Sequence, residues 1–118
     1  MPDAHTGTDT AATWFAAVAA HHGERWSPSA SPKFGANALR LQGKIYAALT
    51  RGRQLLLKLP PTRCTALVAA HRAQRFESGG RVMNGWVVLN TADAKDWIAL
   101  SEEARAFVAA QASRKYRS

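Results

Sequence analysis

The chain has 118 residues, of which 47% are hydrophobic and 20% charged, and its formal net charge is +8. This length favours a single domain, and the hydrophobic fraction excludes a disordered chain. No apolar run approaches the roughly 18 residues of a membrane span, no secretory signal opens the sequence, and the single cysteine, Cys64, excludes an internal disulfide framework. We therefore expect a cytoplasmic protein with no membrane partner, in which a loose tail (residues 1–8), one folded domain (9–113) and a basic tail (114–118) follow one another.

A first helix is expected from about residue 9 to His22, because Thr8, Asp9 or Thr10 can cap its start and Gly23 can end it. Helical spacing predicts one apolar face on it, made of Trp14, Phe15, Val18, Ala19 and His22. The next segment, residues 27–32, contains two prolines and three serines and is expected to be an extended loop.

From residue 38 to residue 59 the apolar pattern alternates with the period of a β-strand. Side chains on a strand alternate between the two faces, so one residue more or less in a connection moves the apolar side chains of the next strand to the other face. Three strands of a meander therefore share one apolar face only if both connections have lengths that keep this alternation in phase. Three-residue loops at 41–43 and 50–52, each with glycine in the left-handed third position, meet this condition. They would pair Leu39 with Ile45 and Ala47 with Leu55. The predicted apolar face consists of Leu39, Ile45, Ala47, Leu49, Leu55, Leu57 and Leu59.

The opposite face of this meander carries the candidate binding residues. It lies in a strongly basic stretch, since residues 25–81 hold eleven Lys or Arg and one acid, Glu77. Such a segment attracts phosphate-rich partners, although a merely solvated sheet face gives the same pattern. Cations here would grip phosphates and a tyrosine would stack on a base, unless another element covers the face. The nucleic-acid-binding candidates are Arg40, Lys44, Tyr46 and Lys58 on the face, with Arg51 and Arg53 at the adjoining tip.

The second half of the chain predicts two further helical segments and a fourth strand. A helix opens at residues 60–62 and ends by about Arg75, with an inward stripe of Cys64, Leu67, Val68 and His71. A break at 78–80 precedes a strand over 82–89. A last segment starts near residues 90–93, as one long helix or two short ones, on the stripe Trp97, Leu100, Ala104, Phe107, Val108 and Gln111. The predicted fold class is α+β, with an antiparallel meander of about four strands against three or four helices.

The residues do not suggest catalysis, a cofactor or a metal. The sequence has no phosphate-binding loop and no nucleophile elbow. His21 and His22 are adjacent on a helix and point to different sides, and Cys64 and His71 are two helical turns, about 10 Å, apart. Cys64 lies on an inward stripe, which favours a packed thiol over a nucleophile.

Four short motifs resemble a known family. They are Lys33-Phe34-Gly35, Gly43-Lys44-Ile45-Tyr46-Ala47, Leu56-Leu57-Lys58-Leu59 and Met83-Asn84-Gly85-Trp86. Their order and spacing resemble the TfoX N-terminal domain and the MmcQ/YjbR group of small bacterial proteins. The resemblance implies an α+β domain with an antiparallel sheet, and an association with competence regulation or DNA binding, without catalytic residues. Two departures are the lack of the second domain of TfoX-type regulators and Ala36 where a second glycine is usual.

Together these patterns predict a non-enzymatic, cytoplasmic binding or regulatory module. The leading hypothesis is weak, sequence-tolerant contact with the phosphate backbone of a nucleic acid. The competing hypothesis is a protein-interaction module, in which an apolar surface docks a protein partner or a second copy of the chain. An exposed patch around Tyr46, Leu56 and Trp86 would favour the second hypothesis, and a continuous positive surface the first.

Overall fold

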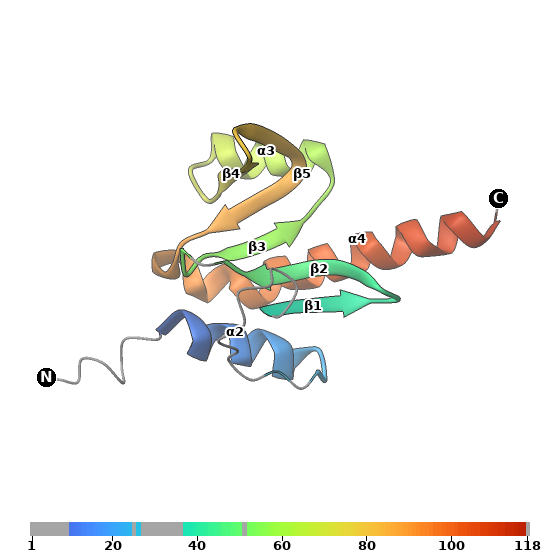
Figure 1. Cartoon of the computed structure of the whole chain (residues 1–118), viewed down its shortest axis with the longest axis horizontal. Coiled ribbons are helices and arrows are strands. Elements are labelled where there is room, and N and C mark those ends of the chain that lie inside the picture. Colours follow the sequence, from blue (N-terminus) through green and yellow to red (C-terminus); the bar gives the residue numbers. More distant parts are fainter. Residues whose placement is uncertain (1–9, 25, 27–36, 51, 118) are drawn as a thin grey trace, which may run out of the picture.

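The computed structural model describes residues 10–24, 26, 37–50 and 52–117, with helical backbone alone over 112–117. The predicted N-terminal tail, the loop at 27–32 and Arg51 lie outside these residues. The elements, in chain order, are α2 (Thr10–His21), β1 (Ala38–Leu41), β2 (Lys44–Leu49), β3 (Leu55–Lys58), α3 (Pro61–Ala69), β4 (Gln74–Ser78), β5 (Arg81–Leu89), the 3-10 helix η2 (Thr91–Asp96) and α4 (Trp97–Arg117) (Figure 1).

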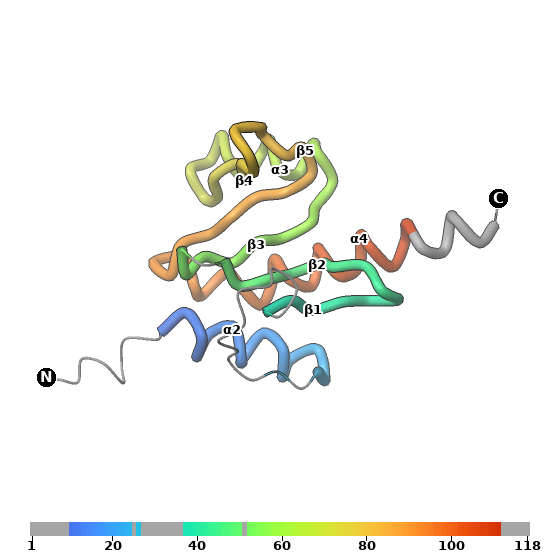
Figure 2. The backbone as a smooth tube through the Cα atoms, in the orientation of Figure 1, coloured from blue at the N-terminus to red at the C-terminus, as the bar shows by residue number. Residues whose placement is uncertain are grey.

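The strands form one antiparallel sheet in the order β1-β2-β3-β5-β4, so the predicted α+β class is confirmed. The chain leaves β3 through α3 and returns as the β4–β5 hairpin, which places β5 beside β3 (Figure 2). The last helical segment is one long helix, α4, preceded by η2. No helix in the described part of the chain is long and apolar enough to cross a membrane.

Helices α2 and α3 end in the same backbone motif, the first with a glycine and the second without one. After α2, Gly23 takes a φ of 73°, and backbone hydrogen bonds from Gly23 to Ala20 and from Glu24 to Ala19 form a Schellman motif. The same motif ends α3 at Ala69, where His71 takes the left-handed position with a φ of 59°. The helix was predicted to end by about Arg75, and it ends earlier, at Ala69. No glycine marks this end in the sequence, because His71 takes the position where glycine is usual.

The predicted β1–β2 loop is also wrong, because the structure has a two-residue turn at Gln42 and Gly43, both with positive φ. The pairing then shifts between Arg40, opposite Ile45, and Leu39, opposite Ala47, so β2 carries one extra residue, Tyr46. This bulge returns Ala47 to the face of Leu39 and leaves Ile45 on the other face.

The predicted β2–β3 register is wrong by two residues, since Leu49, not Ala47, pairs with Leu55. The connection turns at Arg53, whose φ is 61°, and Arg53 N–H donates to the Thr50 carbonyl. The alternating leucines still share one face, because a shift of two residues preserves parity. With the exception of Ile45, the predicted apolar face is buried: Leu39, Ala47, Leu49, Leu55, Leu57 and Leu59.

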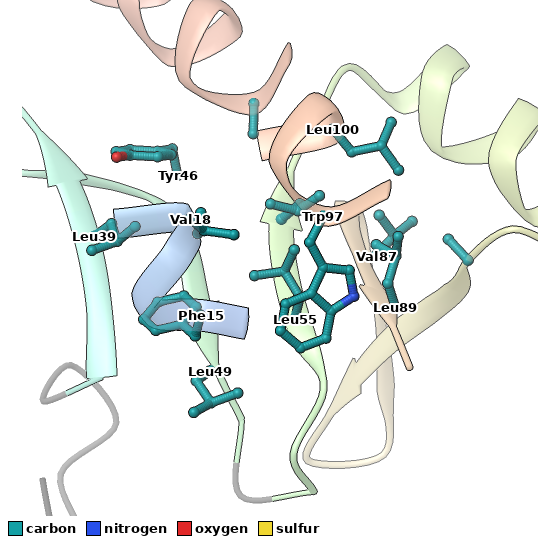
Figure 3. Packing of buried hydrophobic residues seen from close by; sticks show 14 of the residues in the cluster. Phe15, Val18, Leu39, Tyr46, Leu49, Leu55, Val87, Leu89, Trp97 and Leu100 are labelled. Atoms are coloured by element: carbon teal, nitrogen blue, oxygen red, sulfur yellow. The ribbon is translucent and has the colours of Figure 1, made fainter. Parts of the chain in front are cut away.

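This first face of the sheet carries the main core, and the described helices all pack against it (Figure 3). Phe15 and Val18 of α2 and Trp97 and Leu100 of α4 are fully or almost fully buried there. Trp14 is 37% exposed, so its predicted place on the apolar face of α2 is wrong. Burial of the core side chains of a domain is the main favourable contribution to its folding.

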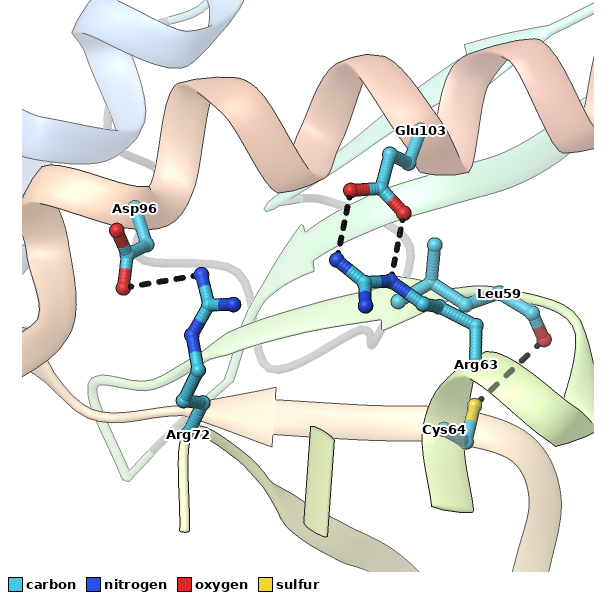
Figure 4. Close-up of polar contacts among 6 residues, drawn as sticks. All are labelled: Leu59, Arg63, Cys64, Arg72, Asp96 and Glu103. Carbon is cyan, nitrogen blue, oxygen red and sulfur yellow. Dashed lines mark hydrogen bonds and ion pairs between the residues drawn. The ribbon is translucent and has the colours of Figure 1, made fainter. Parts of the chain in front are cut away.

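Ion pairs join the helical layer at its surface (Figure 4). Arg63 of α3 makes two hydrogen bonds to Glu103 of α4, at 2.8 and 3.0 Å, and Arg72 lies 3.5 Å from Asp96. These arginines belong to the basic stretch of the sequence, yet they are paired with acids on the helical side. The charge of that stretch is therefore divided between the two sides of the sheet.

Candidate nucleic-acid interface

The second face of the sheet carries a smaller apolar cluster. Ala48, Leu56 and Val88 are buried in it, from β2, β3 and β5. Partly buried side chains pack around them: Ala38, Ile45, Phe76 and Trp86. None of these residues comes from a described helix, so strands alone supply the cluster.

Beside this cluster lies a pocket of about 780 Å³. Its walls come from four strands, the β1–β2 turn and the C-terminal half of α4, and they are mostly apolar. No acidic residue is among the described residues that line it. They are Gly43, Lys44, Ile45, Leu56, Lys58, Phe76, Ser78, Met83, Trp86, Val108 and Gln111.

An ammonium group lies over an aromatic ring at this pocket. Lys58 and Trp86 are direct cross-strand partners on β3 and β5, and Lys58 Nζ is 5.1 Å from the centroid of the Trp86 ring. This distance is typical of a cation–π contact. Gly85, with a φ of 88°, precedes the tryptophan, and a Cβ at this glycine would lie 3.4 Å from Lys58 Nζ. Because that distance is an ordinary van der Waals contact, it is the positive φ that favours glycine at this position.

Three of the predicted cations lie at or beside this pocket. Lys44 and Lys58 line the pocket, and Arg40 is exposed opposite Ile45, so its side chain lies on the same face. Exposed Arg53 lies in the β2–β3 connection, at the end of β2 away from Lys44, and β2 itself spans roughly 16 Å at about 3.3 Å per residue. The structure thus brings together Arg40, Lys44 and Lys58 and separates Arg53 from them, while Arg51 lies outside the described residues.

Tyr46 is not available for stacking, because the bulge places it in the main core with none of its surface exposed. Its hydroxyl donates a hydrogen bond to the carboxylate of Glu24, and its ring centroid lies 5.5 Å from that of His22. Burial, and then the neighbouring carboxylate, raise the pKa of the Tyr46 hydroxyl above its ordinary value. The prediction of a stacking role for Tyr46 is therefore wrong.

The aromatic residues at the pocket are Trp86 and Phe76. Trp86 was considered only as part of a protein-interaction patch with Tyr46 and Leu56, which are both buried, and Phe76 was not assigned to a site.

Phe76 lies on β4. This strand was not predicted, because Phe76 is the only large apolar residue in Gln74–Ser78 and no alternating pattern results. A usable signal was present in Gly79 and Gly80, since paired glycines favour a two-residue hairpin turn. Both glycines have positive φ, at 60° and 80°.

Cys64 is buried in α3, and its thiol lies 3.6 Å from the Leu59 carbonyl oxygen (Figure 4). Burial raises the pKa of this thiol, which disfavours the reactive thiolate. Of the other predicted inward residues of this helix, Leu67 is buried and His71 is exposed. Within the described ranges, no three His, Cys, Asp or Glu side chains are placed to hold a metal ion.

Comparison with known proteins gives no relative: no family model, no curated protein and no solved structure matches this chain. The fold and the second face define it as an α+β domain with a basic, largely apolar pocket. The resemblance to the TfoX N-terminal domain stays a prediction based on four short motifs.

Proposed function

We propose that this protein is a non-catalytic nucleic-acid-binding module whose interface is the second face of the sheet. The observation that carries the proposal is the grouping of Arg40, Lys44 and Lys58, from three neighbouring strands, beside a pocket with no acid among its described lining residues. Cations so placed neutralise phosphates and release condensed counterions, which is the main source of non-specific affinity for nucleic acids.

The binding is expected to tolerate different sequences. The described helices pack on the first face, and α4 reaches the pocket only as part of its wall, through Val108 and Gln111. The basic side chains of the proposed interface lie on strands and not on a helix that could enter the major groove. Contacts from lysine and arginine to phosphates fix position without reading bases. A regulatory role in the cytoplasm, such as coating or marking a nucleic acid, fits a domain that binds without catalysis.

The test is fluorescence anisotropy with labelled duplex DNA, single-stranded DNA and RNA, each at low and at physiological salt. The proposal requires binding to at least one of them at low salt, with an affinity that falls steeply as salt rises. Absence of binding to all three at low salt would overturn it.

A protein-interaction module is the second candidate, and the β4–β5 hairpin favours it. Val82 is 49% exposed and Met83 39% exposed, next to one another on β5. Met83 lines the pocket, and an exposed apolar side chain at a pocket is typical of an interaction surface. Analytical ultracentrifugation of the chain, with Met83→Ser as the comparison, tests whether a second copy docks there.

A further inference from the structure

We propose that the pocket on the second face holds one unstacked nucleobase, so that the protein prefers single strands over duplexes. This inference rests on the proposed function and adds to it the form of nucleic acid that is bound. It commits the pocket to one occupant, a nucleotide within a single strand.

The first argument is the aromatic surface inside the pocket. Trp86 and Phe76 both line it, on neighbouring strands β5 and β4. Aromatic side chains on a sheet face are the usual platform for bases of single strands, because every base has a π-face. Apolar side chains around them, Ile45 and Met83, exclude water from a stacked base.

The second argument is the position of positive charge relative to that surface. A nucleotide places its phosphate one sugar away from its base, so a site for it needs an aromatic surface and cations at close range. Lys58 Nζ lies 5.1 Å from the Trp86 ring centroid, and Lys44 lines the same pocket. The charge complementarity favours an anion with an aromatic part over a neutral apolar ligand.

The third argument is the size and polarity of the pocket. Its volume of about 780 Å³ falls within the range of sites that enclose small molecules, which includes a nucleotide. Ser78 and Gln111 add hydrogen-bonding groups to otherwise apolar walls, and the polar edge of a base needs such partners.

A duplex does not fit this site in the same way. Its paired bases are stacked inside the helix, so one base enters a pocket only after it is flipped out at a cost in stacking and pairing free energy. A single strand avoids that cost. The phosphates of a duplex still reach Arg40, Lys44 and Lys58, which gives weaker binding without the pocket.

The experiment compares three labelled ligands of equal length on the wild-type protein by fluorescence anisotropy: oligothymidylate, a mixed-sequence duplex and an abasic strand. We expect oligothymidylate to bind more tightly than the other two. The abasic strand should bind about 5- to 150-fold more weakly than oligothymidylate. This ratio of affinities corresponds to the free energy of stacking one base on an aromatic side chain.

The matched variants are Trp86→Leu in the pocket and Trp14→Leu on α2, an exposed tryptophan outside the pocket. Trp86→Leu should weaken oligothymidylate binding by a similar factor and leave abasic binding unchanged, whereas Trp14→Leu should change neither. Trp86→Phe should restore part of the affinity. Circular dichroism shows whether each variant is folded. If Trp86→Leu does not fold, the comparison of oligothymidylate with the abasic strand on the wild-type protein still tests the proposal.

Two results separate the possible failures. Equal affinity for oligothymidylate and the abasic strand, with steep salt dependence for both, would overturn the base pocket and leave nucleic-acid binding intact. No binding of any ligand at low salt would overturn the proposed function, and the base pocket with it.

Discussion

The hydroxyl of Tyr46 donates a hydrogen bond to the carboxylate of Glu24, across 22 residues of sequence. The bulge in β2 turns Tyr46 into the main core, and Glu24 follows the end of α2. A buried phenol needs a hydrogen-bond partner, and this carboxylate supplies one at the edge of the core. The pair therefore links the irregular part of the sheet to the first helix.

The first prediction concerns this pair. Tyr46→Phe should lower the free energy of unfolding by about 1 to 3 kcal/mol, because the partly buried carboxylate of Glu24 loses its donor. Urea denaturation measures the change. A double-mutant cycle with Glu24→Ala, which removes the acceptor, isolates the interaction. If the effects of the two substitutions simply add, the hydrogen bond does not stabilise the fold.

The second prediction concerns pH. His22 Nε2 lies 2.8 Å from the Ser101 hydroxyl, which itself donates to the Ile98 carbonyl, so the histidine is the donor to Ser101. Burial, followed by the charges of His21 and Arg105, lowers the pKa of His22 below its ordinary value of about 6.5, although Glu24 and Glu102 oppose the shift.

Because the folded-state pKa is the lower one, the unfolded chain binds more protons as the pH falls. The contribution of His22 to stability is thus fully present above about pH 6.5 and is lost as the pH falls through the folded-state pKa. His22→Gln keeps a donor and should flatten the stability profile in that window, as measured by urea denaturation at a series of pH values. A variant with an unchanged profile would show that other groups cause the dependence.

The sequence predicted the parts of this fold that depend on parity and composition. Alternating leucines predict the buried face of β3, and Gly23 predicts the end of α2. The bulge could not be predicted, because Tyr46 and Ala47 are both compatible with a core and nothing in the pattern marks an extra residue. His71 in a left-handed conformation concealed the end of α3, and the polar composition of β4 concealed a strand.

At the candidate site, too, local patterns predicted some residues and not others. Alternation placed Arg40 and Lys58 on the second face, where they pair with Ile45 and Trp86. It did not place Lys44 there, since Lys44 pairs with Leu41 of the first face and lines the pocket from beside the β1–β2 turn. Trp86 could not be assigned, since its position depends on the positive φ of Gly85 and on the return of the chain through α3. Pockets that depend on a long-range strand pairing are not visible in a local pattern.

The third prediction tests the core. Leu57 has no exposed surface and lies on the central strand β3, between Ala47 and Val87. Leu57→Ala should lower the free energy of unfolding by about 2 to 5 kcal/mol, because the cavity it leaves is closed on both sides. Val82→Ala, at a side chain that is 49% exposed, is the comparison and should change stability little. A small effect at Leu57 would contradict the packing described for the first face.

The fourth prediction concerns Cys64. A buried thiol with a raised pKa should react slowly with a chromogenic disulfide reagent in the native protein and quickly in denaturant. Cys64→Ala should leave nucleic-acid affinity unchanged. If this variant stayed folded and lost a measurable activity, the proposal of a non-catalytic module would be wrong.

The last prediction concerns the cations of the second face. If Arg40, Lys44 and Lys58 each neutralise one phosphate, a plot of log affinity against log salt should have a slope near −2.7 on duplex DNA and about −2.1 on a single strand. Lys44→Ala should flatten the slope by about 0.9 or 0.7, respectively, and weaken all sequences alike, because a phosphate contact carries no base information.

The control for this slope is Lys95→Ala, which removes the same charge from an exposed lysine on η2, next to an alanine of the main core. It should leave the slope unchanged, since the first face makes no phosphate contact in the proposed complex. Equal losses of affinity and slope in the two variants would mean that net charge alone attracts the nucleic acid. A slope that falls only with Lys44→Ala would instead locate the phosphates on the second face, beside Trp86.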